Sequence, residues 1–585
     1  MSILLTTLNS KFIHTNLAIR YLKKYVEDIT KVDIIEFTIN QTTEEIARKI
    51  FILNPDMVGF STYIWNLEQT LDVCKRLKIV NPNIKILLGG PEVSFDSKQL
   101  LEANAFIDYI ICEEGEETFK ELLLGLNPYK IEGLVFRDEE KIIENKRRKP
   151  IENLDSIPSP YIGSEEDFSG KIVYYEASRG CPFTCDFCLS SGKKVRFFSV
   201  ERVLEDIDYL VKKDVKQIKF VDRTFNANKK FAKDIIDHII ELNPEDINFH
   251  FELTARLLDF EQIEYLKKVK EGLFQFEIGV QSTNKKTLKE ISRNEDYEKV
   301  KNVSLLIKEA GNIHQHLDLI IGLPYEDYMT FSKSFDDLYY MQPDKLQLGF
   351  LKLLKGSKLR LNEKMHGYVY LDKPPYEILY NNYISYSDIV KLKFIEEVVE
   401  KYYNEGYFRN SIDYLVKIEF SRPFEFFEDF SKYLFSVDFF NISHSKKTLY
   451  NYLNEYYKHK NFDNYEMLID IMKFDYLYSK VDNTLPEFMQ TTSKIKSNEF
   501  HSILKNPKIL NKMKYHAPDL PTKEIIKDIN ICKFHYDILE IIKNPKGVYE
   551  RDEKIIIFEY NKKGVINKAN VLDITKAYEE MCQWN

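Results

Sequence analysis

The sequence predicts an α/β protein of three parts: an N-terminal doubly wound parallel sheet, a central partial (β/α)6 barrel and a mostly helical C-terminal domain. Over roughly the first two thirds of the chain, short apolar runs alternate with amphipathic helical patterns, which is typical of buried parallel strands and their crossover helices. Beyond that point glycine thins, and Tyr and Phe recur at helical spacing. The chain of 585 residues is too long for one hydrophobic core, so several domains are expected.

Residues 1–140 are predicted to form the doubly wound sheet. We expect its strands at Ile3–Leu8, Asp33–Phe37, Met57–Ser61, Ile84–Gly89 and Tyr109–Cys112. The intervening helices are expected at Leu17–Tyr25, Thr43–Leu53, Leu67–Lys78 and Glu116–Leu124. Ligands of such sheets bind at the carboxyl ends of the strands, and two loops fall there, Gly89-Gly90-Pro91 and Glu113-Glu114-Gly115-Glu116.

Residues 141–164 are predicted to be a linker, and the basic run Lys146–Pro150 is expected to be a solvated part of it. The net charge of −9 argues against a polymeric nucleic acid as partner. The run Met1–Leu8 has no basic region or cleavage site and predicts a strand rather than a signal peptide. Because no run approaches 18 apolar residues, we expect no membrane span and a cytoplasmic protein.

Residues 165–375 are predicted to form the partial barrel from six βα units. The expected strands are Lys171–Ala177, Gln217–Val221, Asn248–Leu253, Phe274–Val280, His316–Ile321 and Lys345–Leu353. Helical patterns between them include Val203–Lys212, Phe231–Leu242, Ile263–Val269 and Val303–Ala310.

Residues 376–585 are predicted to be mainly helical, with a late strand at Ile555–Tyr560. The helical patterns are clearest at Tyr403–Tyr414, Phe424–Phe435 and Tyr450–Tyr457. Aromatic side chains at this spacing indicate a packed core rather than a ligand surface.

Three cysteines, Cys181, Cys185 and Cys188, follow the first barrel strand at the spacing C-x3-C-x2-C. Structural zinc sites close with four ligands, and no second Cys or His pair follows here. A disulfide is disfavoured in a reducing compartment. Three thiolates can instead hold three irons of a [4Fe–4S] cluster and leave the fourth iron open. The remaining cysteines are scattered singly and are expected to be small apolar residues: Cys74, Cys112, Cys532 and Cys582.

The segment Ser178–Cys188 closely resembles the cluster motif of the radical S-adenosylmethionine (radical SAM) family. The resemblance implies that the open iron chelates SAM, and that one electron splits SAM into methionine and a 5′-deoxyadenosyl radical. It also implies that the backbone of Phe187, the residue before the third Cys, lies near the adenine.

Later strands repeat the SAM-binding pattern of that family in order, at Phe251–Leu253, Ile278–Ser282, Ile291–Arg293 and Leu317–Pro324. The resemblance implies that SAM is contacted by residues at these places: Glu252, Gln281, Arg293 and Asp318. Acidic and amide groups suit the ribose hydroxyls and the amino group, and a guanidinium suits the carboxylate. Gly322 would let the backbone approach the ligand, and Asp222 falls where relatives brace the amino group of SAM.

The first 140 residues resemble the cobalamin-binding domain that precedes many radical SAM domains. Cobalamin-binding domains of the methionine synthase type carry D-x-H-x-x-G after the first strand, and their His ligates cobalt. This chain has Phe12-Ile13-His14-Thr15-Asn16-Leu17 there, so the Asp and the Gly are missing. Bound cobalamin and a vestigial or substrate-binding domain both stay open, and His14 is expected to cap the next helix.

The resemblance implies a radical SAM enzyme that starts bond cleavage or rearrangement on a small organic substrate, with a flavodoxin- or ferredoxin-type reductant. Three alternatives stay open. The first is a queuosine-salvage lyase that acts on a modified nucleotide. The second is a cobalamin-dependent methyltransferase. The third is a non-catalytic iron–sulfur or corrinoid-binding protein.

Overall fold

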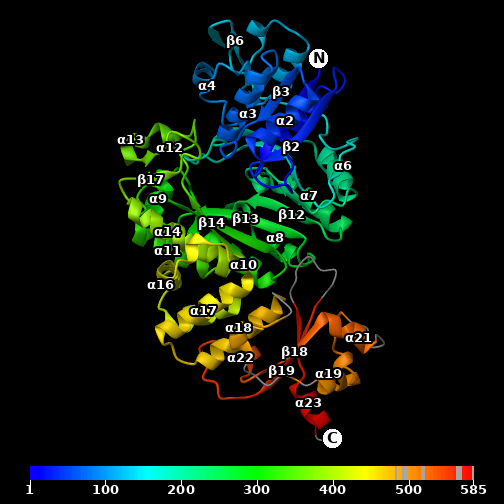
Figure 1. Ribbon diagram of the computed structural model, residues 1–585, viewed down its shortest axis with the longest axis vertical. Coiled ribbons are helices and arrows are strands. Elements are labelled where there is room, and N and C mark those ends of the chain that lie inside the picture. The colour runs from blue at the N-terminus through cyan, green and yellow to red at the C-terminus, as the bar shows by residue number, and fades with distance from the viewer. Residues whose placement is uncertain (481–483, 491–494, 496, 516–520, 561–568, 583–585) are drawn as a thin grey trace. The chain divides into compact units, whose positions relative to one another are not determined.

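The computed structural model describes residues 1–480, 484–490, 495, 497–515, 521–560 and 569–582 (Figure 1). They form two compact units, one of residues 1–327 with 349–385 and one of residues 328–348 with 386–585. The first unit holds the N-terminal sheet and most of the barrel. The division of the chain at residues 140, 164 and 375 stays a prediction.

The N-terminal sheet has seven strands in the order β2-β1-β3-β4-β5-β6-β7. The first five pair in parallel, and β6 and β7 extend the sheet as an antiparallel edge. The five predicted strands are therefore confirmed, whereas the edge hairpin was not predicted. The strands are β1 Ile3–Asn9, β2 Val32–Thr38, β3 Met57–Ser61, β4 Lys85–Gly89, β5 Tyr109–Ile111, β6 Leu134–Asp138 and β7 Lys141–Glu144.

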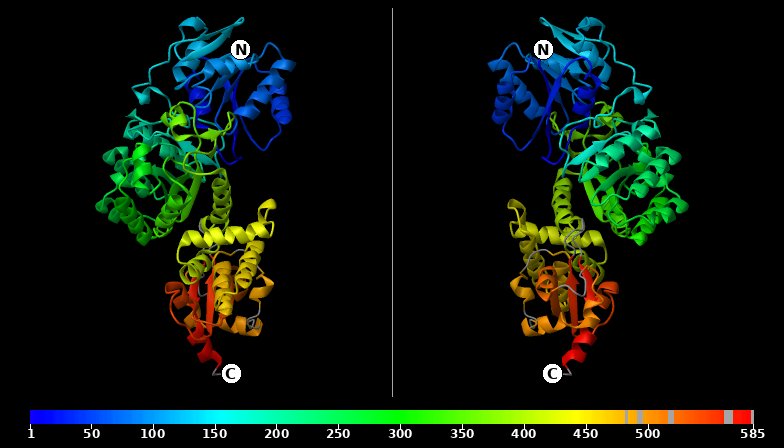
Figure 2. Two further views of the ribbon diagram at one scale, coloured as in Figure 1. Left: turned by 90° about the vertical axis from the view of Figure 1, so that its left-hand side faces the viewer. Right: turned by 90° about the vertical axis from the view of Figure 1, so that its right-hand side faces the viewer.

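Helices cover both faces of this sheet, as a doubly wound fold requires (Figure 2). Leu4 and Leu8 of β1 pack in one core with α2, α3 and α4, while Ile3 and Leu5 pack in the other core with α1 and α5. The helices are α1 Leu17–Tyr25, α2 Thr43–Leu53, α3 Leu67–Val80, α4 Ser97–Ala103 and α5 Glu116–Leu123. Asn16, and not His14, caps α1 by accepting the Ile19 N–H, so the capping role expected for His14 is wrong.

The segment 141–164 differs from the expected solvated linker. β7 occupies its first four residues, because Glu139 adopts a positive φ of 52° and turns the chain back along β6. Arg148 of the basic run donates to Thr118 Oγ1 at 3.0 Å and pairs with Glu121, so this side chain is tied to the fold.

The barrel sheet has the order β15-β14-β13-β12-β11-β8, and its strands β8 and β11 to β14 pair in parallel. The boundary between the two units passes through β15. A hairpin that the sequence did not predict, β9 with β10, follows β8. The strands are β8 Ile172–Tyr175, β9 Ser178–Cys181, β10 Lys193–Phe197, β11 Gln217–Phe220, β12 Asn248–Leu253, β13 Phe274–Gln281, β14 His314–Ile321 and β15 Lys345–Phe350.

Helices follow the barrel strands as expected for βα units. Those of the first unit are α6 Val200–Val211, α7 Lys229–Leu242, α8 Phe260–Leu266, α9 Lys285–Glu290 and α10 Tyr297–Ala310. The segment 349–385 adds short elements, namely α12 Lys358–Leu361, α13 Glu363–His366, β16 Val369–Tyr370 and β17 Ile378–Tyr380.

The second unit is mainly helical, as predicted, but it also contains a three-stranded antiparallel sheet. Its strands are β18 Ile529–Phe534, β19 Lys554–Glu559 and β20 Asn570–Asp573, of which only β19 was predicted. Its helices are α11 Tyr328–Tyr339, α14 Tyr386–Val399, α15 Arg409–Glu419, α16 Pro423–Ser436, α17 Lys446–Lys460, α18 Tyr465–Tyr478, α19 Ser497–Ile503, α20 Pro507–Leu510, α21 Thr522–Ile525, α22 Ile538–Lys543 and α23 Thr575–Cys582.

The scattered cysteines follow the prediction where the structure describes them: Cys74 and Cys112 are buried and Cys532 is partly buried. The Cys582 side chain lies outside the described part. Within the described residues, none of the helices combines the length and the apolar character needed to cross a membrane.

Candidate active site

The three cysteines of the motif lie on the β9–β10 hairpin. Cys181 ends β9, and the turn that carries Cys185 and Cys188 is closed by a hydrogen bond from the Cys188 N–H to the Cys185 carbonyl at 3.1 Å. The Asp186 N–H, donating to Ile291 O at 3.0 Å, ties this turn to the barrel. Backbone hydrogen bonds therefore set the cysteine loop at the carboxyl end of β8.

These residues fit an iron–sulfur cluster. Cys181 and Cys185 are buried, each 8% exposed, and all three cysteines are free thiols. In the described part of the chain, no three His, Cys, Asp or Glu converge on a single metal ion. A cluster needs no such convergence, because each thiolate binds a different iron. Phe187 is half-buried in the turn between the last two cysteines.

Arg293 links the cysteine loop to the barrel strands. Its Nη1 lies 3.6 Å from Cys185 Sγ, and its Nη2 donates to the carbonyl of Gly279 on β13. Burial raises the pKa of the Cys185 thiol, and the nearby guanidinium opposes that rise. The Gln281 side chain folds back over Gly279, where a Cβ would come within 2.2 Å of Gln281 Nε2. The fold thus brings together two residues that the sequence pattern singled out, Arg293 and Gln281, beside the cluster loop.

Two acidic residues flank β13, namely Asp318 on β14 and Glu252 on β12. Asp318 on β14 pairs in register with Gly279, and its Oδ1 is buried with no hydrogen-bond partner among the described residues. Burial, together with the charges of Glu277 and Glu252, raises the pKa of Asp318 well above its usual value. Burial also raises the pKa of Glu252. A buried acceptor without a donor fits a ligand that brings a cationic amino group, as SAM does.

Two predicted site residues make internal contacts instead. Asp222 is buried and accepts from the Ala177 N–H at 3.0 Å and from Ser178 Oγ at 2.5 Å, so it braces the chain just before the cluster loop. Gly322 has a φ of 94°, and a Cβ there would lie 2.0 Å from Ile378 Cδ1. The positive φ therefore favours glycine here, and any side chain would also have to displace that of Ile378.

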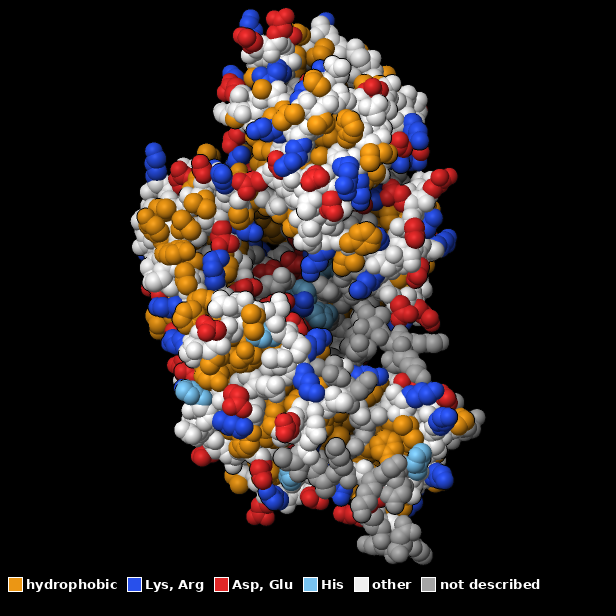
Figure 3. Space-filling view, viewed as in Figure 1, with side chains coloured by type: hydrophobic (Ala, Val, Ile, Leu, Met, Phe, Trp, Pro, Cys, Tyr) orange, Lys and Arg blue, Asp and Glu red, His pale blue; other side chains and the backbone are white. Residues whose placement is uncertain are grey.

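A cavity of about 1320 Å³ opens between the carboxyl ends of the N-terminal strands and the barrel. It is larger than the roughly 300–1,000 Å³ of sites for drug-sized ligands. The barrel contributes Cys188 and Glu252 to its wall, and the N-terminal domain contributes the two predicted loops, Gly89–Pro91 and Glu113–Glu116. Figure 3 shows a hollow at this level, with acidic, basic and histidine side chains on its walls.

Ion pairs join the two domains beside the cavity. Arg179, two residues before the first cluster cysteine, lies 2.6 Å from Glu116 and 2.9 Å from Glu176. Arg196 on β10 pairs with Glu114. The loop after β5 is thereby held against the hairpin that carries the cysteines. Arg147, Arg148 and Lys149 of the basic run also line the cavity, which corrects the expectation that this run is only solvated.

The sequence analysis did not predict a layer of polar residues on the neighbouring barrel strands β12, β13 and β14. His250 Nε2 lies 3.0 Å from Glu277 Oε2, and the rings of His250 and His316 are 6.3 Å apart. The signal was present: polar residues alternate with buried apolar ones along β13, whose apolar face packs toward the helices. Such strict alternation on a barrel strand indicates a polar lumen.

Comparisons with known proteins agree with this architecture. The B12 binding domain matches residues 3–123, the Radical SAM superfamily matches residues 175–338, and a family described as a protein of unknown function (DUF4080) matches residues 364–558. An uncharacterised methyltransferase of Pyrococcus horikoshii is 31% identical over 325 residues, which cover 53% of this chain and 70% of the relative.

The cobalamin-dependent radical SAM methyltransferase TokK of Streptomyces tokunonensis is 26% identical over 345 residues, which cover 54% of this chain and 50% of TokK. Among solved structures, the cobalamin-dependent SAM radical enzyme OxsB with aqua-cobalamin bound matches with a TM-score of 0.57 and 17% identity, over 81% of this chain and 79% of OxsB. At that identity the likeness shows the fold alone.

These two sequence relatives are named methyltransferases and others are named cyclases, so the comparisons give no support to the expected lyase. The domain matches confirm the [4Fe–4S] cluster and SAM as cofactors, and they resolve the open question of cobalamin in favour of binding. The chain belongs to the radical SAM superfamily of enzymes, in the group that carries a B12-binding domain before the radical SAM domain.

Proposed function

We propose that this radical SAM enzyme is a cobalamin-dependent methyltransferase that acts on a small organic substrate. One observation carries the proposal: a single cavity of about 1320 Å³ is lined by the strand-end loops of the B12-binding domain and by Cys188 and Glu252 of the barrel. A corrinoid held by the strand-end loops of the B12-binding domain and SAM held by the barrel would share this space. The names of these two relatives support methyl transfer, while other relatives are named cyclases.

The chain supplies positions and charges for this chemistry. When bound, the cluster supplies single electrons to SAM, and cobalamin supplies a carrier for a methyl group. Cys181, Cys185 and Cys188 would hold three irons. Arg293 sits where it can pair with a carboxylate of SAM, and Asp318 offers its unpartnered oxygen to an ammonium group.

The ion pairs of Arg179 close one side of the site. Arg179 is only 11% exposed and lies between Glu116 of the N-terminal domain and Glu176 of the barrel. This contact limits the access of water to the cavity from that side, which protects a radical from side reactions.

The same residues also suit hydrogen abstraction followed by bond cleavage or rearrangement without methyl transfer. The two reactions differ in the products of SAM. Methyl transfer through cobalamin yields S-adenosylhomocysteine, whereas hydrogen abstraction yields 5′-deoxyadenosine.

The test is an anaerobic assay of the full chain reconstituted with iron and sulfide and reduced with dithionite or a flavodoxin-type donor. S-adenosylhomocysteine and 5′-deoxyadenosine are followed by mass spectrometry with and without hydroxocobalamin, and small substrates are screened from modified nucleosides onward. We expect S-adenosylhomocysteine that requires hydroxocobalamin and disappears in Cys185→Ala. Deoxyadenosine alone, formed equally with and without hydroxocobalamin in the presence of a turned-over substrate, would contradict methyl transfer.

A further inference from the structure

One face of β11 and of the residues that follow it points into the cavity. Lys219, Val221 and Arg223 line the cavity, whereas Phe220 and Asp222 between them are buried away from it. Successive side chains of an extended chain point to opposite sides, so residues two apart share a face. The strand therefore presents two cations with one valine between them, and we call Lys219, Val221 and Arg223 its cationic face.

The ammonium group of Lys219 is not hydrogen-bonded within the fold. Its Nζ lies 3.6 Å from Glu277 Oε2 on β13, beyond the roughly 2.7–3.2 Å of an N–H···O hydrogen bond. The same oxygen of Glu277 lies closer to another group, 3.0 Å from His250 Nε2. Lys219 donates no hydrogen bond to any described residue, and its side chain is 28% exposed. Its N–H groups are therefore available to a ligand in the cavity.

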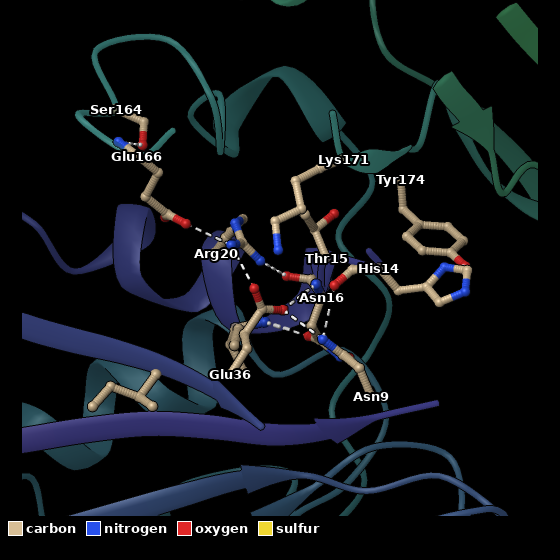
Figure 4. Close-up of polar contacts among 12 residues, drawn as sticks. Asn9, His14, Thr15, Asn16, Arg20, Glu36, Ser164, Glu166, Lys171 and Tyr174 are labelled. Atoms are coloured by element: carbon tan, nitrogen blue, oxygen red, sulfur yellow. Dashed lines mark hydrogen bonds and ion pairs between the residues drawn. The ribbon is translucent and has the colours of Figure 1, made fainter. Parts of the chain in front are cut away.

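The neighbours of Lys219 in the sheet bring it no negative charge. Lys219 is in register with Tyr174 of β8 on one side and with His250 of β12 on the other. The side chain of Tyr174 points toward His14, whose Nδ1 lies 2.9 Å from the Tyr174 hydroxyl (Figure 4). Burial lowers the pKa of His250, although Glu277 opposes that change, so the neutral imidazole is favoured. Both neighbours are thus uncharged groups with contacts of their own.

Other cations of this unit are paired with carboxylates at hydrogen-bond distance. Arg20 on α1 pairs with Glu36 at 2.8 Å and also with Glu166, as Figure 4 shows. Arg196 on β10 pairs with Glu114. Guanidinium groups that fasten the fold are therefore matched by carboxylates, and the cationic face of β11 differs from them.

The charge of the cationic face is only partly balanced by the carboxyl groups around it. Arg223 is exposed and donates no hydrogen bond to any described residue. Burial raises the pKa of Glu252 on the adjacent strand, although Arg223 and Lys219 oppose that rise. Burial acts in the same direction on Glu277, but His250 and Lys219 beside it outweigh burial and lower the pKa of Glu277 to about 2. Glu277 is thus ionised at neutral pH, whereas burial disfavours a charge on Glu252.

The cationic face ends beside the cysteines of the cluster loop. Thr224 directly follows Arg223, and its Oγ1 lies 3.7 Å from Cys181 Sγ. A molecule held by the cationic face therefore extends toward the place where the cluster and SAM are expected.

We propose that the cationic face of β11 binds an anionic group of the substrate, either a carboxylate or a phosphate. This inference rests on the proposed function, because it takes the cavity as the substrate site. Ammonium and guanidinium groups form charge-assisted hydrogen bonds with both anions. Lys219 and Arg223 are four residues apart on an extended chain, about 13 Å between their Cα atoms, so their long side chains can reach one anion from two sides. Val221 between them brings no group that competes for it.

The test measures the binding of inorganic phosphate and of acetate to the full-length protein with its reconstituted, oxidised cluster. Anaerobic nuclear magnetic resonance titrations follow the ³¹P signal of phosphate and the methyl ¹H signal of acetate, at an ionic strength held constant with KCl. We expect the wild type to bind at least one anion, and Lys219→Gln and Arg223→Gln each to bind it about 10-fold more weakly or worse. Preference for phosphate would identify a phosphate-bearing substrate, and preference for acetate a carboxylate.

Two further variants serve as controls. Lys216→Gln removes an exposed lysine just before β11 and should bind both anions as the wild type does. Lys219→Arg keeps the charge and should retain binding. If Lys219→Gln does not fold, Arg223→Gln decides the outcome on its own.

Unchanged binding of both anions in a folded Lys219→Gln, or no binding by the wild type, would overturn the proposal. A weaker affinity for SAM with unchanged affinity for the anions in Arg223→Gln would overturn it too, because Arg223 would then belong to the SAM site. The titrations contain no turnover. S-adenosylhomocysteine and 5′-deoxyadenosine, measured in separate assays, therefore report on the proposed function independently of anion binding.

Discussion

The N-terminal sheet and the barrel sheet both end at one cavity, but they present different chemistry to it. The barrel strands bring charged side chains to its wall, such as Lys219 on β11 and Glu252 on β12. The N-terminal strands β3 and β4 end at small residues, and at Gly90 a φ of 115° and the closeness of Thr62 leave no room for a side chain. The barrel side of the cavity suits a small charged ligand that is held by its functional groups. The N-terminal side lets a large ligand approach the backbone.

The largest expected effect tests the barrel side at its cluster. Replacing Cys185 with Ala removes one of three thiolates from the hairpin, so we expect loss of the [4Fe–4S] signal and a fall of 5′-deoxyadenosine and S-adenosylhomocysteine to background. Iron content, the spectrum of the reduced cluster and product formation are the measurements. Cys532→Ala, on β18 of the other unit, is the matched control and should retain all three. An intact, SAM-cleaving cluster in Cys185→Ala would break the assignment.

The next effect concerns the charges beside the cluster. Arg293→Lys loses the fork that reaches both Gly279 O and Cys185, and it removes the donors expected to meet the carboxylate of SAM. A hydrogen bond to a charged group is worth about 1.5–3 kcal/mol, which corresponds to about a 10–100-fold rise in the Kd of SAM. Anaerobic calorimetry measures it. Arg256→Lys, an exposed neighbour whose side chain donates to Asn294 O and to no other described residue, should leave the Kd unchanged.

Both regions could be predicted as folds, and the reason is the same. Continuous apolar strands and amphipathic helices are local signals, and they were placed within a few residues from β1 to β5 and from β11 to β14. The order of the cysteines, Arg293 and Asp318 along the chain follows a motif, and their individual roles toward the cluster and SAM stay predictions.

What could not be predicted depends on contacts between distant residues. Asp222 looked like a ligand contact from its place after β11, but only the fold shows that Ala177 and Ser178 use both of its oxygens. The D-x-H-x-x-G pattern has the partner of its His two residues earlier, whereas His14 Nδ1 lies 2.9 Å from the hydroxyl of Tyr174 on β8, 160 residues later. The α4 helix and the β6–β7 hairpin were missed because both are short and only partly apolar.

A smaller effect tests the N-terminal side of the comparison. In Gly90→Ala the new Cβ would lie 2.3 Å from Thr62 O, so the loop after β4 must shift. We expect less corrinoid bound per protein after reconstitution, with SAM binding at the barrel unchanged.

Gly125→Ala is the matched control, because Gly125 also has a positive φ, 71°, but a Cβ added there has no described atom within 4 Å. Strain at such positions costs about 1–3 kcal/mol in both variants, so only the difference in corrinoid content is diagnostic. Equal corrinoid content in the two variants would contradict a backbone-lined ligand site.

The smallest effect on chemistry is expected at Asp222, which braces the barrel side without reaching the cavity. Burial outweighs its hydrogen bonds and raises the pKa of Asp222 from 3.8 to about 7. The folded chain therefore holds a proton that the unfolded chain releases between these values. The contribution of this group to stability is consequently lost as the pH rises from 3.8 to about 7.

Asp222→Asn cannot ionise and lacks this pH dependence, although it loses one acceptor for Ser178. Between pH 5 and pH 8 we expect the wild type to lose up to about 2–3 kcal/mol relative to Asp222→Asn, seen as faster hydrogen exchange at the Ala177 amide. Parallel pH dependence in the two proteins would mean that Asp222 is already ionised in the fold, and that its bonds to Ala177 and Ser178 outweigh its burial.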